Sequence, residues 1–124
     1  MVAINPAHIV GTGGAVGALL RYVVNERIET ESFPLGTFTV NVVGSFVLAV
    51  LTFAGANEEV LLLFGTGACG SFTTFSSFSF ETVRLWETND RTRAILNAGG
   101  NLVGAGIAIG LAWGLMFYLP TLAN

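Results

Sequence analysis

Four long apolar stretches, separated by three short polar links, dominate this sequence of 124 residues. Hydrophobic residues make up 52% of the chain and charged residues only 10%. A soluble domain this small buries about two-thirds of its unfolded surface and needs a charged exterior, which this chain lacks. Since about 20 helical residues cross the hydrocarbon core of a bilayer, each stretch is long enough to span it. We therefore predict an all-α membrane protein with one four-helix transmembrane domain over residues 1–124 and spans near residues 7–24, 35–56, 60–85 and 94–119.

The small number of charges excludes two function classes. Lys and Arg number 5 and Asp and Glu number 8, for a net charge of −3, so the chain lacks the basic surface that binds nucleic acid. No serine has a histidine base at a comparable depth, and no two acids share a predicted site. We therefore expect no nucleic-acid partner and no enzyme activity.

The basic residues all fall on one side of the predicted helices. They flank the end of the first span and the link between the third and fourth spans, and they are Arg21, Arg27, Arg84, Arg91 and Arg93. Loops rich in Lys and Arg stay in the cytoplasm, so this bias predicts that both termini lie outside the cell.

Asn41 lies near the middle of the second span, where an unpaired amide would cost several kcal/mol. Thr37 lies four residues earlier and on the same helical face, so the two side chains can line one polar path. Two interpretations stay open for Asn41: a hydrogen bond that joins two helices, or a wall of an ion pathway.

The third span is rich in glycine and hydroxyl residues at membrane depth, which predicts a helix broken near its middle, within residues 70–74. Non-helical backbone survives in a membrane only where protein or a cavity satisfies its carbonyls. Oxygens exposed by the break, near Gly70 to Thr73, suit a hard cation such as Na⁺. A kink satisfied by the hydroxyls is the alternative.

Phe75 and Phe78 lie on one face beyond this break, with Ser76 and Ser77 between them. A stripe of aromatic residues is usually packed core. The row of hydroxyls favours a different role, because ring edges carry positive potential and, with hydroxyl donors, can replace part of the hydration shell of a small anion. We therefore predict an uncharged conduction path along this face.

Other polar residues extend this path. Arg21 and Glu81 both lie on the arginine-bearing side and are candidates for vestibule charges or an ion pair; anchoring of Arg21 at the membrane interface is the alternative. Asn97 and Asn101, one turn apart in the fourth span, add amide donors to a second wall.

Four segments carry the most distinctive patterns of the chain: residues 13–22 (GGAVGALLRY), 34–44 (PLGTFTVNVVG), 65–81 (GTGACGSFTTFSSFSFE) and 96–104 (LNAGGNLVG). Together they resemble the Fluc, or CrcB, family of fluoride channels, and the resemblance covers nearly the whole chain. It implies a multi-pass protein of a prokaryotic cell membrane that passively exports cytoplasmic fluoride. It also implies four-helix subunits paired as an antiparallel dimer in the lipid bilayer, with two fluoride pores and a central structural sodium ion.

The resemblance also implies roles for individual residues. Phe75 and Phe78 are similar to the pore phenylalanines whose edges face fluoride, and Asn41 to the pore amide. The residues similar to the polar track are Thr37, Ser76 and Ser77. Gly70 and Thr73 are similar to the residues whose main-chain oxygens bind sodium.

Two rival functions and one question of assembly stay open. A small proton-coupled multidrug exporter also has four short helices, but it needs a carboxylate deep in the bundle, and Glu81 lies toward an end of its span. A non-transporting membrane scaffold leaves the hydroxyl row unexplained. Because the arginines favour one orientation, we predict pairing with a separately encoded homologue that inserts the opposite way.

Overall fold

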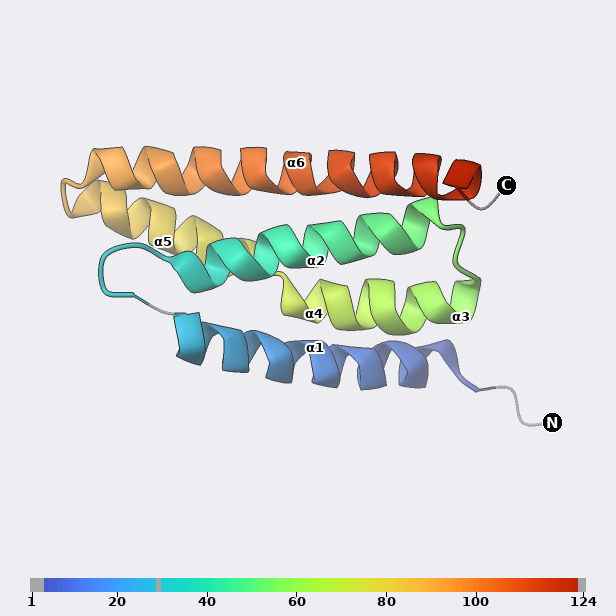
Figure 1. The fold of residues 1–124 in the computed structure, drawn as a ribbon. Coiled ribbons are helices and arrows are strands. Elements are labelled where there is room, and N and C mark those ends of the chain that lie inside the picture. The colour runs from blue at the N-terminus through green and yellow to red at the C-terminus, as the bar shows by residue number, and fades with distance from the viewer. Residues whose placement is uncertain (1–3, 29, 123–124) are drawn as a thin grey trace.

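The computed structural model describes residues 4–28 and 30–122. Within these ranges every regular element is helical (Figure 1). The elements in chain order are α1 (Pro6–Ile28), α2 (Leu35–Phe53), α3 (Glu58–Val60), the π-helix η1 (Leu61–Cys69), α4 (Gly70–Phe72), α5 (Phe75–Glu87) and α6 (Arg91–Leu122).

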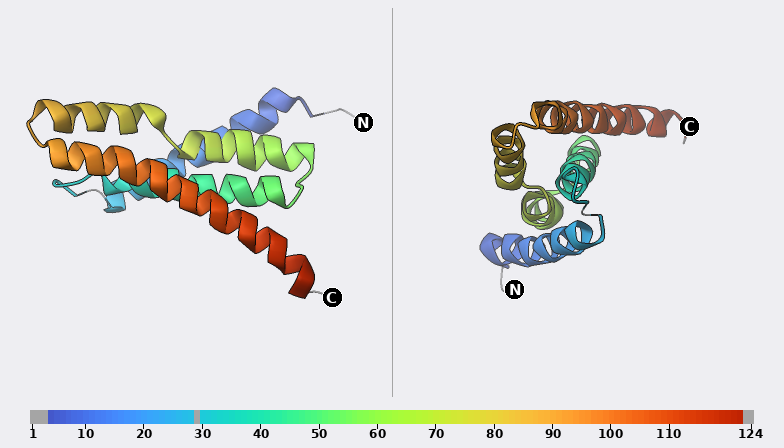
Figure 2. Two further views of the ribbon diagram at one scale, coloured as in Figure 1. Left: turned by 90° about the horizontal axis from the view of Figure 1, so that it is seen from above. Right: turned by 90° about the vertical axis from the view of Figure 1, so that its left-hand side faces the viewer.

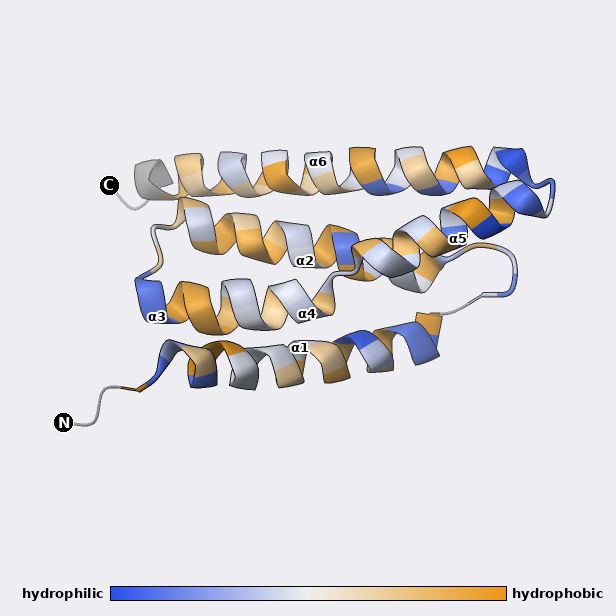
Figure 3. Cartoon of the chain, turned by 180° about the vertical axis from the view of Figure 1, so that it is seen from behind, coloured by the Kyte–Doolittle hydropathy of each residue, from blue (hydrophilic) through white to orange (hydrophobic). Residues whose placement is uncertain are grey.

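Four of the helical stretches are long and apolar enough to cross a membrane, and they are Pro6–Ile28, Leu35–Phe53, Glu58–Glu87 and Arg91–Leu119. Hydrophilic residues gather at the ends of these stretches and in the links, while the middle parts are largely apolar (Figure 3). The predicted all-α fold with four membrane-length helices is therefore confirmed. The third stretch consists of α3, η1, α4 and α5 in series.

The helices form an open arrangement in which α1 and α6 lie on opposite outer sides (Figure 2). α1 packs mainly on η1 and α4, and α6 packs mainly on α2 and α5. The C-terminal part of α6 turns away from the other helices (Figure 2). The start of α1 and the end of α6 lie at one end of the molecule, while the end of α1, the start of α2 and the α5–α6 link lie at the other (Figure 1).

The α5–α6 link is tight because two polar residues satisfy its backbone. Asn89 adopts a left-handed conformation (φ 63°). Two backbone amides of the link donate to carbonyls of the last turn of α5: Asn89 N to Trp86 O (3.2 Å) and Asp90 N to Leu85 O (2.9 Å). Asp90 then caps α6, since its Oδ1 accepts from Arg93 N at 3.2 Å and its Oδ2 lies 3.0 Å from Arg93 Nη1. α5 and α6 are thereby held as an antiparallel pair.

α1 approaches the third stretch closely along its glycines. A Cβ added at Gly13 would fall on the carbonyl oxygen of Leu63, and one at Gly17 would fall on that of Ala68. Close backbone contact between small residues is the usual way in which helices associate in lipid, and Gly13 and Gly17, four residues apart on α1, make such a contact. Three glycines of α6 make no such close contact. In the described part of the chain, nothing lies within 4 Å of a Cβ added at Gly106, Gly110 or Gly114.

The break in the third stretch falls on two threonines. Thr73 (φ −78°, ψ 158°) and Thr74 (φ −149°, ψ 116°) are extended, whereas Gly70 is still helical (φ −62°, ψ −34°). The predicted break is thus confirmed, but it begins three residues after Gly70. The physical reason is that glycine permits a break without requiring one, and the residues that hold the extended segment lie on α2.

Candidate functional site

Asn41 of α2 stabilises the break, because its side-chain amide makes hydrogen bonds to both the N–H and the carbonyl of Thr74. Its Oδ1 accepts from Thr74 N at 2.8 Å, and its Nδ2 donates to Thr74 O at 3.2 Å. In an uninterrupted α-helix the Thr74 amide would donate to the Gly70 carbonyl. The asparagine side chain therefore replaces a helical partner and satisfies backbone that lipid cannot.

The second hydrogen of the Asn41 amide reaches α6. Asn41 Nδ2 donates to Asn101 Oδ1 at 3.0 Å, and Asn101 Nδ2 donates to Asn97 O and Oδ1 at 2.9 and 3.1 Å. Both N–H groups of Asn41 are thus engaged by protein acceptors. Of the two interpretations of this residue, the bond between helices is observed, and its role as a pore amide stays a prediction.

Thr74 also starts α5. Its Oγ1 accepts from Ser77 N at 3.2 Å, as an N-cap does, donates to Ser77 Oγ at 3.1 Å and lies 3.3 Å from Ser76 Oγ. These contacts place the two predicted serines on the first turn of α5, with Ser76 exposed and Ser77 half-buried.

Phe75 and Phe78 stand together on that turn, with ring centroids 5.7 Å apart and planes inclined by 50°. They face a groove of about 310 Å³ beside the break, whose lining residues are Asn41, Thr73, Thr74, Phe75, Phe78, Asn101, Leu102 and Ala105. None of these eight residues is charged. The groove gathers four of the predicted pore residues from three helices, whereas Thr37, Ser76 and Ser77 are not among its lining residues.

The predicted vestibule residues do not line this groove, but each makes a hydrogen bond to another element. Glu81 Oε1 accepts from Thr37 Oγ1 at 2.9 Å, and Thr37 is 3% exposed. The half-buried Arg21 donates from Nη1 to Thr73 O at 3.4 Å. Sequence reasoning assigned Arg21 to the membrane interface or to a vestibule and did not find this contact with the break.

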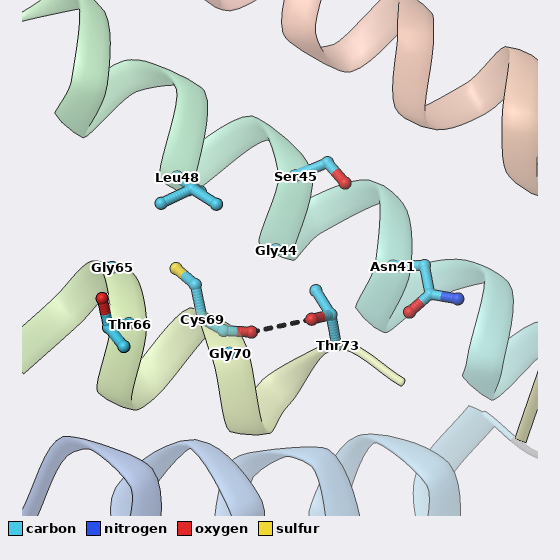
Figure 4. A pocket seen from close by; sticks show the side chains of 9 residues that line it. All are labelled: Asn41, Gly44, Ser45, Leu48, Gly65, Thr66, Cys69, Gly70 and Thr73. Carbon is cyan, nitrogen blue, oxygen red and sulfur yellow. Dashed lines mark hydrogen bonds between the residues drawn. The ribbon is translucent and has the colours of Figure 1, made fainter. Parts of the chain in front are cut away.

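A second pocket, of about 360 Å³, lies between α2 and the segment before the break (Figure 4). Gly70 and Thr73, the two predicted sodium ligands, both line it. Thr73 Oγ1 donates to Cys69 O at 2.9 Å, and Thr73 N donates to the same oxygen at 3.0 Å. α2 approaches closely here, because a Cβ added at Gly44 would fall on the Thr73 side chain.

Sequence reasoning missed Thr74 and misplaced Asn97. Thr74 is buried and makes contacts in two directions, and its position directly before the FSSF segment is the signal of an N-cap. Asn97 was expected to add an amide donor to a second wall beside Asn101, but it is 0% exposed, does not line the groove, and donates to Thr82 Oγ1 instead.

Comparison of the sequence with known protein families assigns the chain to one of them. A family model described as "CrcB-like protein, Camphor Resistance (CrcB)" matches residues 8–114. The chain belongs to the CrcB family. With its four membrane-length apolar helices, this CrcB member is a multi-pass membrane protein.

Three relatives of this CrcB chain carry channel names. It is 60% identical over 116 residues to "Fluoride-specific ion channel FluC 2" of Haloarcula marismortui, covering 94% of this chain and 98% of the relative. It is 56% identical to "Fluoride-specific ion channel FluC 1" of Halobacterium salinarum, over 87% and 91% of the two chains. It is 45% identical to "Fluoride-specific ion channel FluC" of Thermotoga maritima, over 75% and 80%.

Proposed function

We propose that this chain forms a fluoride-selective ion channel that passively exports cytoplasmic fluoride. The observation that carries the proposal is the uncharged groove at the helix break, where Phe75 and Phe78 lie beside the amides of Asn41 and Asn101. The names of the relatives support it, and they support the prediction that the chain is no enzyme.

The chemistry of this groove suits rapid passage of a small anion. Ring edges offer positive potential without a full charge. The two predicted serines do not line the groove, but they lie on the same first turn of α5 as the rings. A full positive charge would bind the anion too tightly, whereas several weak contacts allow it both to enter and to leave. Passive flow then needs no energy source beyond the fluoride gradient.

We propose further that Gly70 and Thr73 hold a structural sodium ion through their main-chain oxygens. The donor set fits a hard cation. The Gly70 carbonyl is released by the diversion of the Thr74 amide to Asn41, and the Thr73 carbonyl, which accepts one long bond from Arg21, has a second lone pair. Replacement of Na⁺ by N-methylglucamine in the bath should slow fluoride efflux, and equal efflux in both baths would contradict this site.

The channel is proposed to be an antiparallel dimer in a prokaryotic cell membrane. In the isolated chain Phe75 is 79% exposed and the groove is open on one side, so a narrow path needs a wall from another subunit. The one-sided arginines favour a separately encoded homologue of opposite orientation as the partner.

Efflux from liposomes tests the function. Vesicles containing the purified protein and loaded with potassium fluoride or potassium chloride receive a potassium ionophore, and an ion-selective electrode follows release of the anion. We expect fast fluoride release, little chloride release and no need for a proton gradient. Proton movement driven by a cationic drug would instead support the multidrug exporter, and silence in all assays would support the scaffold.

A further inference from the structure

The asparagine contacts continue beyond the groove into a longer hydrogen-bond relay. Asn97 Nδ2 donates to Thr82 Oγ1 at 2.9 Å, and Thr82 Oγ1 donates to Phe78 O at 2.7 Å. The relay therefore runs from Thr74 N through Asn41, Asn101, Asn97 and Thr82 to Phe78 O, and every step donates in the same direction.

This relay ends on the same short segment from which it starts. Thr74 immediately precedes Phe75, and the last acceptor is the carbonyl of Phe78, so both ring-bearing residues lie between its two ends. The intervening side chains belong to α2, α6 and α5. A chain of aligned donors away from bulk water strengthens each of its bonds, and the bonds of this relay are buried or part-buried, so we expect the relay to be stiff.

Two members of the relay have no contact with the groove. Asn97 is 0% exposed, and neither Asn97 nor Thr82 is among the residues that line it. Their hydrogen-bonding groups are directed at each other, at Asn101 and at the Phe78 backbone. Neither residue can reach an ion that passes through the groove, but both fix the first turn of α5 against α6.

We propose that Asn97 and Thr82 are positioning residues that set the width of the fluoride path by fixing the Phe78 turn. This proposal rests on the proposed channel function. When the relay is cut, the turn that carries both rings loses its hydrogen-bonded connection to α6. The path then widens and admits an anion larger than fluoride.

The test compares isosteric variants by fluoride and chloride efflux from liposomes. Thr82→Val keeps the shape and removes the hydroxyl, and Asn97→Leu keeps the approximate size and removes the amide. We expect each to lower the fluoride-to-chloride efflux ratio by about tenfold, because each removes two of the relay's buried or part-buried hydrogen bonds. Thr82→Ser should restore the wild-type ratio. Thr52→Val is the matched control, since Thr52 makes the same four-residue back-bond, to Leu48 O at 2.8 Å, outside the relay.

The fluoride-to-chloride efflux ratio distinguishes a change in the width of the path from a loss of folded protein. Loss of folded protein lowers the fluxes of both ions together and leaves their ratio unchanged, so an unchanged ratio in Thr82→Val overturns the proposal. The double variant should show the same ratio as either single variant, because one cut already opens the relay, and multiplied effects would also overturn it. If the wild-type protein releases no fluoride, the channel function itself fails. If it conducts and Thr82→Val behaves like Thr52→Val, only the relay proposal fails.

Discussion

A single amide side chain, that of Asn41, makes the helix break compatible with the membrane interior. It provides an acceptor for Thr74 N and donors for Thr74 O and Asn101 Oδ1. Serine or threonine has one hydroxyl hydrogen and cannot make this set of contacts, whereas asparagine has two N–H donors and a carbonyl acceptor. The residue type at this position follows from the backbone that it must satisfy.

Replacement of Asn41 by leucine should therefore destabilise the protein strongly. Asn41→Leu leaves the Thr74 amide and carbonyl without their partner, and each buried unsatisfied group costs about 1–3 kcal/mol. We expect a clearly lower midpoint of thermal unfolding in detergent, followed by intrinsic tryptophan fluorescence.

Asn57→Ala is the control for this substitution. It removes an N-cap bond to Val60 N (3.0 Å) on the exposed α2–α3 link, which costs about 1 kcal/mol. Equal midpoints for Asn41→Leu and Asn57→Ala would show that Asn41 does not hold the break.

At the scale of elements, the approach of α1 to η1 determines how the first half of the third stretch is placed. The backbones touch at Gly13 and Gly17, and η1 is wound as a π-helix along this contact. π-Helical turns are uncommon and occur often near functional sites. Here the π-helix leads directly to α4 and the break.

Alanine at either contact glycine should disrupt this packing. In Gly13→Ala and Gly17→Ala the new methyl group meets a backbone carbonyl that has no room to move, so we expect a loss of the monodisperse peak in size-exclusion chromatography in detergent. Gly11→Ala, on the same helix with nothing within 4 Å of its Cβ, should behave like the wild type. A monodisperse Gly17→Ala protein with an unchanged unfolding midpoint would refute the close contact.

The elements could be predicted from the sequence to a large extent, because each span is long, apolar and bounded by charges. The broken third stretch was also predictable from its glycine and hydroxyl residues. Its exact position at Thr73 and Thr74 was not, because it depends on Asn41, 33 residues away in sequence. The π-helical winding of η1, which packs along α1, also has no local signature in the sequence.

The candidate site was predictable only in part, for a similar reason. Four of the predicted pore residues do line one groove, namely Phe75, Phe78, Asn41 and Asn101. Helical spacing alone predicts that Phe75 and Phe78 share a face of α5. The connections between helices were not predictable, so the contact of Arg21 with Thr73 and the burial of Asn97 were missed. Helical periodicity predicts which residues share a face of one helix, but it does not predict which other helix packs against that face.

For the whole molecule, the distribution of arginine raises the question of orientation. The last turns of α1 and α5 and the start of α6 carry arginine, and these lie at the end of the molecule opposite the start of α1 and the end of α6 (Figure 1). The positive-inside rule therefore predicts that the termini lie outside the cell. An antiparallel pair of identical chains would need both orientations in equal amounts.

Labelling of a cysteine added at the C-terminus tests this orientation in cells. Cys69, the single native cysteine, is buried and should react slowly. We expect a membrane-impermeant maleimide applied from outside to label nearly all of the added cysteine. Labelling of about half of the molecules would instead indicate dual insertion and a homodimer.

The central claim is that the break presents Phe75 and Phe78 to an uncharged path for fluoride. The most direct test is fluoride efflux from liposomes that contain Phe75→Ala, Phe78→Ala or, as a control from the same helix, Phe80→Ala. Phe80 is 69% exposed and does not line the groove. The account predicts that the first two variants lose most of the wild-type fluoride efflux and that Phe80→Ala retains it. Wild-type efflux in Phe75→Ala and Phe78→Ala would contradict the account.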